Sequence, residues 1–465
     1  MSRKKILFVH PLATIGLRIE KETKYPPMGI VFLAAVAREN GYEVKILDAN
    51  IEDNSWGKIN LILADFKPDV VGISFTSLLA ESASRVAELV KKTNNRIAVI
   101  AGGYHPTVMP RLVMENKNFD FSVVGEGEQT LMELIRELFG SRNFNLVKGL
   151  VFRRGEEVVQ TERRELINDL DVLPFPAYDL LPIGKYSNLA STRKPYVTFI
   201  RSRGCPFLCT FCGVQKMFGR RYRCQSPEKT MAEIDILVKD FRVKEINFRD
   251  SDFLIDRANV EKFCQLMIKK QHNLVWTCNA RVDMVNEQIL SLMKRAGCRL
   301  ITYGVESGNL EILNRLRKGI NPDQARQAIT LAKKVKIKCA LDIILGGVGE
   351  TQTTFRETMD FIKDTDPDYA SFSYLTAFPG SDLYEEAEKR GWFLNKEKND
   401  YSYELVNLNA TGMTTDELSK LFNQAMREFY FRPSYVFKRL RNLNWPELKN
   451  NFKGSWTIIR NFVNR

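Results

Sequence analysis

Short apolar runs alternate with amphipathic stretches through the first third of the chain. The runs, rich in β-branched residues, lie at 5–9, 43–48, 70–75, 97–101 and 121–124. Helix-like patterns, such as those at 29–40 and 79–91, separate them. Uninterrupted apolar runs of this length are typical of strands buried on both faces of a parallel sheet. The pattern therefore predicts an α/β domain over residues 1–140, with a Rossmann-like or flavodoxin-like parallel sheet.

A second series of strand and helix patterns begins near residue 196. Its strand-like runs lie at 196–201, 245–249, 274–280, 299–305, 338–345 and 370–376. Ser226 and Asn321 each precede a proline, which puts a capping side chain ahead of proline at the first helical position. Six such units predict a partial (β/α)6 barrel of the TIM type over residues 196–395. The hairpin pattern and proline-rich passage within 141–195 predict a connector.

The last segment, 396–465, is helical and basic in pattern. Its apolar positions recur at helical spacing and predict an amphipathic helix that stops before Pro433; they are Leu418, Leu421, Phe422, Ala425, Met426, Phe429 and Tyr430. Beyond it, Phe437, Trp445, Trp456 and Phe462 stand among lysines and arginines. Helices packed on the barrel and a peripheral contact with an anionic membrane are both compatible with this pattern. No nucleic-acid module is recognisable, so we expect no nucleic-acid partner.

Composition adds little to the prediction of fold and function. The chain has 465 residues, of which 44% are hydrophobic and 27% charged, and its formal net charge is +13. The charge favours an anionic partner or surface without selecting one. No apolar run approaches the length of a membrane span, and no signal-peptide pattern is present. We therefore expect a cytoplasmic protein, with a peripheral position at the inner face of the membrane as the alternative that the basic tail allows.

Three of the eight cysteines crowd one loop after the run 196–201. Cys205, Cys209 and Cys212 have CxxxCxxC spacing, and three thiolates on one loop can each bind a different iron of a [4Fe-4S] cluster. The fourth iron is then open to S-adenosylmethionine (SAM), whose sulfonium accepts an electron and releases a 5′-deoxyadenosyl radical. The alternative zinc site needs a fourth ligand, for which Cys224 is available. Scattered cysteines in a chain without a secretory signal argue against disulfides.

Polar residues and glycines follow the predicted barrel strands at their carboxyl ends, where barrel chemistry is expected. Arg281 is a candidate to hold the carboxylate of SAM in a bidentate contact. Glu306 and Asp250 are candidates for its amino group or ribose, with Asn279 and Gly347 as further contacts. The alternatives are an interior salt bridge for Arg281 and Glu306 and helix capping for Asp250.

The strand ends of the N-terminal domain carry a second group of candidates. They are His10 after the first strand, Ser74 and Ser77 after the third, Gly102, Gly103 and His105 after the fourth, and Gly125, Glu126 and Gly127 after the fifth. Ligands of open α/β sheets bind beyond these carboxyl ends. No GxGxxG motif or P-loop accompanies them, so a dinucleotide or nucleoside triphosphate site is not supported.

The cysteine loop resembles that of the radical SAM superfamily. Pro-Pro-Met-Gly at 26–29, Gly-Gly-Tyr-His-Pro at 102–106 and Gly-Glu-Gly-Glu at 125–128 together resemble the cobalamin-binding domain that precedes many radical SAM domains. The segments 278–283, 304–308 and 346–350 are similar to the matching barrel parts, so the resemblance covers about residues 5–395.

The resemblance implies a [4Fe-4S] cluster, SAM and cobalamin as cofactors, with the nine strand-end residues as cobalamin contacts. It also implies an electron donor such as flavodoxin or ferredoxin. The Asp-x-His-x-x-Gly motif that supplies an imidazole to cobalt in other cobalamin proteins is absent. We therefore expect no histidine ligand to cobalt. For His105, packing within its loop is the alternative to cobalt ligation.

The reaction implied is functionalisation of an unactivated carbon, with methyl transfer as the first expectation. Cyclisation, rearrangement or carbon–carbon bond formation on a lipid or tetrapyrrole is the alternative, because the chain resembles the group containing the anaerobic magnesium-protoporphyrin cyclase and hopanoid-associated radical SAM proteins. A non-catalytic cluster and cobalamin module is a second alternative. The expected substrate is a small molecule or a lipid, and the basic, aromatic tail favours a lipid-like one.

Overall fold

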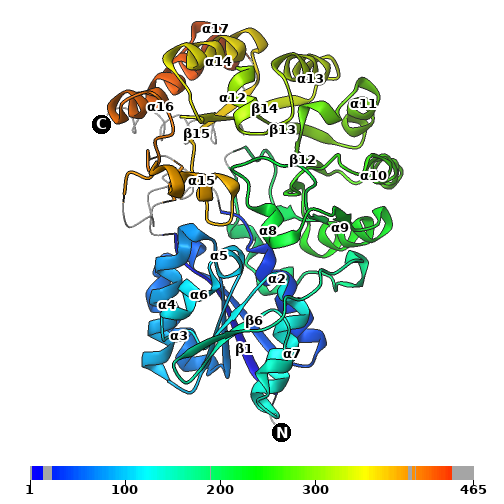
Figure 1. Cartoon of the computed structure of the whole chain (residues 1–465). Coiled ribbons are helices and arrows are strands. Elements are labelled where there is room, and N and C mark those ends of the chain that lie inside the picture. Colours follow the sequence, from blue (N-terminus) through cyan, green and yellow to red (C-terminus); the bar gives the residue numbers. More distant parts are fainter. Residues whose placement is uncertain (1–2, 14–23, 189, 396–400, 404, 442–465) are drawn as a thin grey trace.

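The computed structural model describes residues 3–13, 24–188, 190–395, 401–403 and 405–441. These residues form two α/β units stacked end to end (Figure 1). The N-terminal unit, coloured blue to cyan, occupies the lower half of the view, and the curled barrel sheet with its helices occupies the upper half. The predicted fold class, a parallel sheet followed by a partial barrel, is confirmed.

Five parallel strands form most of the N-terminal sheet, in the spatial order β2-β1-β3-β4-β5. They are β1 (Lys5–His10), β2 (Glu43–Asp48), β3 (Val70–Ser74), β4 (Ala98–Gly102) and β5 (Phe121–Val123). A hairpin of β6 (Leu150–Arg154) and β7 (Glu157–Gln160) adds two antiparallel strands beyond β5. The sequence placed this hairpin in the connector. It joins the sheet because Val151 and Phe152 are apolar and become buried beside β5.

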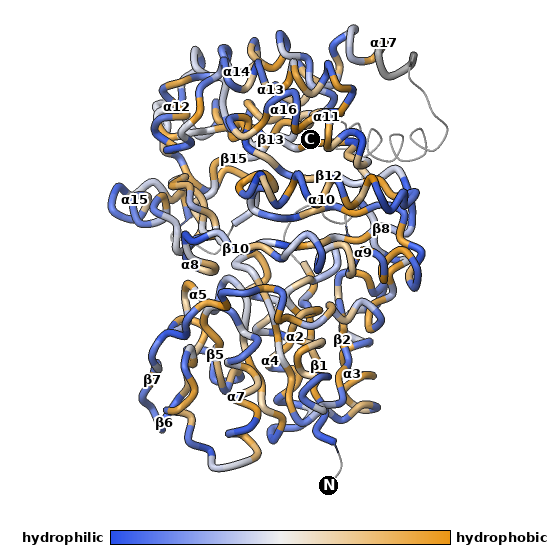
Figure 2. Tube along the Cα trace, turned by 90° about the vertical axis from the view of Figure 1, so that its right-hand side faces the viewer, coloured by the Kyte–Doolittle hydropathy of each residue, from blue (hydrophilic) through white to orange (hydrophobic). Residues whose placement is uncertain are grey.

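Alternate residues of β1 enter two different cores. Ile6 and Phe8 pack in one hydrophobic cluster, whereas Leu7 and Val9 pack in the other. Helices α2 (Met28–Glu39) and α7 (Gly127–Phe139) cover the first face, and α3 (Ser55–Phe66), α4 (Ala80–Thr93) and α6 (Pro110–Glu115) cover the second. Figure 2 shows apolar segments running through the centre of this unit. Burial on both faces explains the uninterrupted apolar runs of the sequence.

Six parallel strands in the order β15-β14-β13-β12-β11-β8 form the curled barrel sheet. They are β8 (Tyr196–Phe199), β11 (Glu245–Phe248), β12 (Val275–Ala280), β13 (Cys298–Glu306), β14 (Lys338–Leu345) and β15 (Tyr369–Tyr374). The helices that follow them are α9 (Pro227–Phe241), α10 (Arg257–Lys270), α11 (Glu287–Arg295), α12 (Leu310–Arg315), α13 (Pro322–Lys334) and α14 (Gln352–Thr365). The predicted caps are present, since Ser226 and Asn321 accept backbone hydrogen bonds from Lys229 and Gln324.

The connector lies between the two units. The Tyr178 hydroxyl donates to the carbonyl of Thr198 on β8 at 2.6 Å, and the backbone N–H of Ala177 donates to the carbonyl of Val31 on α2 at 3.2 Å. One hydrophobic cluster therefore runs from α2 through the connector into the barrel. Four 3₁₀ turns lie in the described part of this segment, at Phe144–Leu146, Leu170–Val172, Tyr178–Leu180 and Ile183–Lys185.

Helices α15 (Asp382–Arg390), α16 (Thr415–Tyr430) and α17 (Pro433–Arg441) complete the described chain. Phe429 on α16 is fully buried, and the Tyr430 hydroxyl donates to the carbonyl of Ala370 on β15 at 2.7 Å. Both aromatic residues belong to the predicted amphipathic helix. They pack on the barrel because α16 lies against its last strand, which agrees with the first of the two alternatives for this segment. Phe437 is exposed, whereas Trp445, Trp456 and Phe462 lie outside the described residues.

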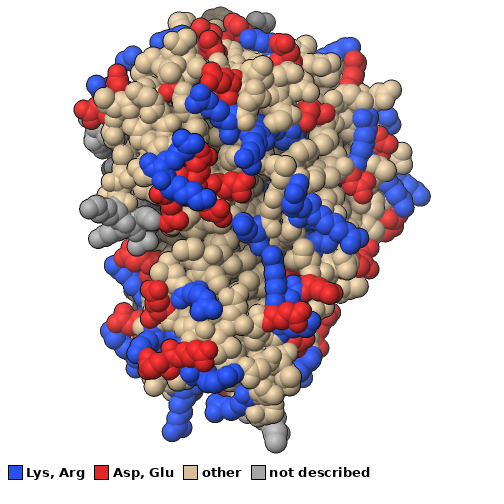
Figure 3. Space-filling view, in the orientation of Figure 1, with Lys and Arg blue, Asp and Glu red and all other residues tan. Residues whose placement is uncertain are grey.

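Among the described residues, no helix is both long and apolar enough to cross a membrane. On the face in Figure 3, basic and acidic side chains are interspersed over both halves of the molecule.

Candidate functional site

The cysteine loop lies between a small antiparallel ladder and helix α8 (Val214–Phe218). The ladder joins β9 (Ser202–Arg203) to β10 (Arg223–Cys224). Gly204 has φ +87°, and an ideal Cβ there would lie 2.1 Å from the Arg221 carbonyl oxygen, so only glycine fits. The backbone N–H of Thr210 donates to the carbonyl of Leu316 at 3.0 Å, which fastens the loop to the barrel wall beyond β13.

The three predicted cluster cysteines share this loop and are free thiols, each partly exposed. Burial is the main reason why the pKa of each thiol is raised, to about 11 for Cys212. Within the described residues, no three His, Cys, Asp or Glu side chains converge as a mononuclear metal requires. Three thiols on one loop can each bind a different iron of a cluster.

Cys224 lies on β10, paired with Ser202 in the ladder. Burial raises the pKa of its thiol to about 11, and the charges of Arg201 and Asp250 also act on it.

Asp250 stabilises the strand end that leads into the cysteine loop. Its Oδ1 accepts hydrogen bonds from the backbone N–H groups of Arg201 and Ser202 at 3.0 and 2.7 Å, and from the Ser202 hydroxyl at 2.7 Å. Its Oδ2 lies 3.3 Å from Nε of the fully buried Arg201. This geometry gives Asp250 a structural role, because its carboxylate is buried and engaged with the backbone before the cysteines; its contact with SAM stays a prediction.

Arg281 forms an interior ion pair. Its Nε and Nη2 each donate to Asp283 at 2.9 Å, and its Nη1 donates to the Lys318 carbonyl at 2.8 Å. The guanidinium also stacks on the ring of Phe207, 3.8 Å from its centroid. The geometry favours the alternative of an interior salt bridge for Arg281, and its contact with the SAM carboxylate stays a prediction. Arg281 also contacts the segment between the first two cysteines through Phe207.

Glu306 pairs with Lys318, a residue that sequence reasoning missed. The Lys318 ammonium donates to Oε1 of Glu306 at 2.7 Å, and both side chains are buried. Glu306 is also one of the few non-glycine residues with positive φ, at +68°. The charges of Lys318 and Glu306 both act on the pKa of Cys209, which places this ion pair beside the cysteine loop.

The remaining predicted SAM contacts differ from each other. Asn279 is partly exposed on β12, and its side chain makes no hydrogen bond within the described residues. An ideal Cβ on Gly347 would lie 2.8 Å from Ile312, so packing against α12 already requires a small residue there. The side chain of Asn279 is therefore available to bind a ligand, whereas packing alone explains why residue 347 is a glycine.

Two glycines leave open space above adjacent strand ends of the N-terminal sheet. An ideal Cβ on Gly102 or Gly125 would meet no atom within 4 Å. Gly103, with φ +95°, brings the backbone so close to Ser74 and Phe75 that a Cβ would lie 2.9 Å from both. A flat ligand can thus approach the backbone at the ends of β4 and β5, which fits the predicted corrin site. His10 and Ser74 are partly buried at the ends of β1 and β3.

Ser77 and His105 bind each other. Ser77 Oγ lies 2.9 Å from Nδ1 of the buried His105, and burial lowers the pKa of this histidine to about 4. The geometry supports loop packing for His105, the alternative to cobalt ligation.

Glu126 and Gly127 also have structural partners. Gly127 begins α7, and a Cβ there would lie 3.2 Å from Leu33. The Glu126 carboxylate accepts hydrogen bonds from Nη1 of Arg223 at 2.8 and 3.0 Å and from the backbone N–H of Ile167 at 2.7 Å. Arg203 lies 3.2 Å from Glu126 and donates to Glu128 at 2.6 Å. Glu126 thus belongs to a buried ionic network between the two units, and its contact with cobalamin stays a prediction.

Tyr104 brings the loop after β4 against the cysteine loop. An ideal Cβ on Gly213, the residue after Cys212, would lie 1.6 Å from the Tyr104 hydroxyl oxygen. That hydroxyl donates to the carbonyl of Pro379 at 2.8 Å. The predicted corrin edge and the predicted cluster loop are therefore in direct contact.

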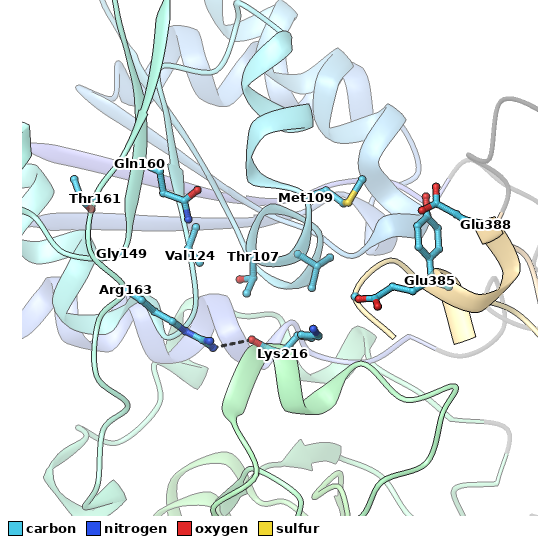
Figure 4. Close-up of a pocket in the computed structure, with 13 residues that line it drawn as sticks. Thr107, Met109, Val124, Gly149, Gln160, Thr161, Arg163, Lys216, Glu385 and Glu388 are labelled. Carbon is cyan, nitrogen blue, oxygen red and sulfur yellow. Dashed lines mark hydrogen bonds between the residues drawn. The ribbon is translucent and has the colours of Figure 1, made fainter. Parts of the chain in front are cut away.

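A separate pocket of about 450 Å³ opens between the two units, beside the edge of the N-terminal sheet and α15 (Figure 4). Arg163 and Lys216 lie on one side of it and Glu385 and Glu388 on the other, and Arg163 donates to the Lys216 carbonyl at 3.0 Å. None of the predicted contact residues lines this pocket.

Comparisons with known proteins agree with the division of the chain into an N-terminal unit and a barrel unit. The family model of the B12-binding domain matches residues 16–135, and that of the radical SAM superfamily matches residues 199–362. An uncharacterised methyltransferase of Pyrococcus horikoshii is 34% identical over 439 residues, which cover 94% of this chain and 95% of the relative. The anaerobic magnesium-protoporphyrin IX monomethyl ester cyclase of Rubrivivax gelatinosus is 29% identical over 440 residues, 93% of this chain and 78% of that protein.

Among solved structures, the cobalamin-dependent SAM radical enzyme OxsB, with aqua-cobalamin and SAM bound, has the same fold. Its TM-score is 0.77 at 19% identity, over 99% of this chain and 72% of that one.

Proposed function

We propose a reaction for this chain on the premise that it belongs to the radical SAM enzymes that carry an N-terminal B12-binding domain. It is a cobalamin-dependent radical SAM enzyme with a [4Fe-4S] cluster, SAM and cobalamin as cofactors. When bound, the cluster and SAM supply radical chemistry at an unactivated carbon, and cobalamin supplies a methyl group.

The chain's own residues hold these groups in defined places. Cys205, Cys209 and Cys212 are the cluster ligands in this proposal. The neighbouring ion pair of Glu306 and Lys318 offers a carboxylate and an ammonium to the amino and carboxylate groups of SAM. The open backbone at Gly102 and Gly125 is the proposed seat of the corrin.

The transfer of a methyl group to carbon is the reaction that we propose. The observation that carries it is the contact of Tyr104 with Gly213, because it joins the corrin edge to the cluster loop within one molecule. A relative that covers nearly the whole chain is named a methyltransferase, which supports the proposal. The cyclase relative keeps ring closure as the second candidate.

Transfer of an isotopically labelled methyl group tests this proposal. Anaerobic holoenzyme is incubated with SAM labelled in its methyl group, a reductant and metabolite extract from the source organism. Methyl transfer predicts label in bound cobalamin and in a product, together with 5′-deoxyadenosine. Formation of 5′-deoxyadenosine with label that never leaves SAM would contradict methyl transfer and favour cyclisation.

The reaction needs a small-molecule substrate and an electron donor. We propose a flavodoxin or ferredoxin as the donor, because the cluster accepts single electrons. We also propose a peripheral contact of the basic tail with an anionic membrane, for which the exposed Phe437 on α17 is the described support.

Co-sedimentation with vesicles tests the membrane contact. The truncation is placed after Arg441, since the Tyr435 hydroxyl binds the Asp368 carbonyl at 3.2 Å and α17 belongs to the packed structure. Full-length protein is expected to sediment with anionic but not neutral vesicles, in a salt-sensitive way. Binding that survives truncation or ignores lipid charge would contradict the contact.

A further inference from the structure

The inner face of the barrel sheet carries a polar row. In the strand register, Phe248 on β11 pairs with Cys278 on β12. Arg249, the residue after Phe248, therefore lies beside Asn279, which in turn pairs with Thr302 on β13. One step further, Gly304 pairs with Asp342 and Asp342 with Ser371. Residues in register on adjacent strands point to the same side of a sheet. Arg249, Asn279, Thr302, Asp342 and Ser371 therefore share the inner face.

Solvent reaches this row, although the opposite side of the same strands is sealed. Arg249, Asp342 and Ser371 are exposed, and Asn279 and Thr302 are partly exposed. The intervening outward residues, such as Cys278, Ile301 and Leu341, are fully buried under the helices. The inner wall is thus accessible and polar, which is the character of a site for a hydrophilic ligand.

Arg249 has no partner for its charge. Within the described residues its guanidinium forms no hydrogen bond or ion pair, and it stacks on the ring of Tyr25 at 5.1 Å. The other arginines of this region each pair with a carboxylate; they are Arg201, Arg203, Arg223, Arg281 and Arg299. A guanidinium that is oriented by an aromatic ring and left without an anion is suited to bind a carboxylate or phosphate in a bidentate contact.

Asp342 is the second unpaired charge on the inner wall. Its carboxylate makes no hydrogen bond or ion pair within the part of the chain that the structure describes. Although solvent reaches its carboxylate, the surrounding barrel walls reduce its hydration and raise its pKa to about 6; the charge of Glu306 is a further cause, and that of Arg249 acts in the opposite direction. The charge of Arg249 thus acts on Asp342, although the two side chains form no salt bridge.

We propose that Arg249, oriented by Tyr25, binds an acidic group of the substrate inside the barrel, and that Asp342 faces a hydrogen-bond donor of the same molecule. The substrate is then a small polar acid with a carboxylate or phosphate, rather than the lipid-like molecule that the tail suggested. This assignment rests on the proposed function, because it needs a substrate in the barrel beside SAM. Glu306 and Lys318 lie at the cysteine loop and are left to SAM.

Arginine footprinting tests the acid site without turnover. Holoenzyme is treated with phenylglyoxal, with and without acetate or inorganic phosphate, and adducts are located by mass spectrometry. Arg249 is expected to react and to be protected saturably by the anion. Arg220 is the matched control, since it is exposed and has no partner within the described residues, yet lies outside the barrel. Protection of Arg249 that is no greater than that of Arg220 would overturn the site.

Fractionated extract tests the substrate class. Label from the SAM methyl group is followed into acidic solutes retained by an anion exchanger, unretained solutes and lipids. Label is expected in the acidic fraction. Its incorporation there should fall about tenfold in Arg249→Met and less in Arg249→Lys, and should not change in Arg220→Met. Formation of 5′-deoxyadenosine without substrate should stay within about twofold in each variant, as expected for a residue that does not bind SAM.

Label in the lipid or unretained fraction would overturn the substrate class. Loss of SAM cleavage in Arg249→Met would assign the anion to SAM itself and overturn the proposal as well. Absence of any methyl transfer in the wild type, with SAM cleavage intact, would contradict the proposed function instead, and the footprint would still decide the acid site.

Discussion

Glu126 of the N-terminal unit and Arg223 of the barrel unit form a buried ion pair, with Arg223 Nη1 at 2.8 and 3.0 Å from the two carboxylate oxygens. Arg203 approaches the same carboxylate, and both arginines lie in the ladder beside the cysteine loop. The unit that is proposed to hold the corrin is therefore joined to the cluster loop by charge as well as by packing. The spacing between the two cofactors depends on this junction.

Removing Glu126 should weaken the junction strongly. Glu126→Ala leaves Arg203 and Arg223 buried with one carboxylate fewer, and breaking a buried pair from one side costs about 3–5 kcal/mol of unfolding free energy. Urea unfolding followed by circular dichroism measures this loss. Asp179→Asn is the control, because its ion pair with Arg38 is exposed and should matter little. Equal effects of the two changes would contradict the role of the junction.

A side chain at Gly213 should collide with Tyr104. An Ala Cβ would fall 1.6 Å from the hydroxyl oxygen, so the ring must move and lose its hydrogen bond to Pro379. We expect Gly213→Ala to cost about 1–3 kcal/mol. In the Tyr104→Ala background the same change should cost much less, because the colliding atoms are gone. Strictly additive costs in the double-mutant cycle would show that the two loops do not touch.

The three loop cysteines should carry all the protein ligands of the cluster. Replacing Cys205, Cys209 or Cys212 by Ala is expected to abolish the cluster and the cleavage of SAM after anaerobic reconstitution. Cys224→Ala is the matched control and should keep iron content unchanged, because this thiol lies beside Arg201 and Asp250. Iron and sulfide analysis measures both. Loss of metal in Cys224→Ala, with zinc as the metal, would contradict the cluster assignment.

Cobalt should have no histidine ligand. His105 is hydrogen-bonded to Ser77 and buried, which leaves it poorly placed to reach a metal, and no ligand motif follows His10. The electron paramagnetic resonance spectrum of the cob(II)alamin form should therefore lack nitrogen superhyperfine splitting. Splitting that disappears in His105→Ala or His10→Ala would identify the ligand and refute the prediction.

The local pattern of apolar and polar residues predicted much of the fold, because strands buried on both faces and capped helices can each be recognised from a short stretch of sequence. It did not predict that β6 and β7 extend the N-terminal sheet, since that pairing joins residues about thirty positions apart, such as Phe121 and Phe152. The sequence predicted the hairpin itself, but it did not show that the hairpin pairs with β5.

The candidate site was predicted less evenly than the fold. The cysteine loop was predicted from its spacing alone. The ion pair of Glu126 with Arg223 could not be predicted in this way, because the two residues lie 97 positions apart. For Arg281 an interior salt bridge was named as the alternative, but its partner Asp283, only two residues away, was not. Lys318, Arg249 and Asp342 carry no motif. The strand register places Arg249 and Asp342 on the inner wall of the barrel, and the ion pair with Glu306 places Lys318 beside the cysteine loop.

One protein is proposed to bind a SAM-cleaving cluster and cobalamin at two loops that touch each other. The most direct measurement is an anaerobic assay of reduced holoenzyme for 5′-deoxyadenosine and for label from the SAM methyl group in bound cobalamin, repeated with Cys209→Ala. The account predicts both products in the wild type and loss of 5′-deoxyadenosine in the variant. Reconstituted protein that holds cluster and cobalamin but forms neither product would contradict it.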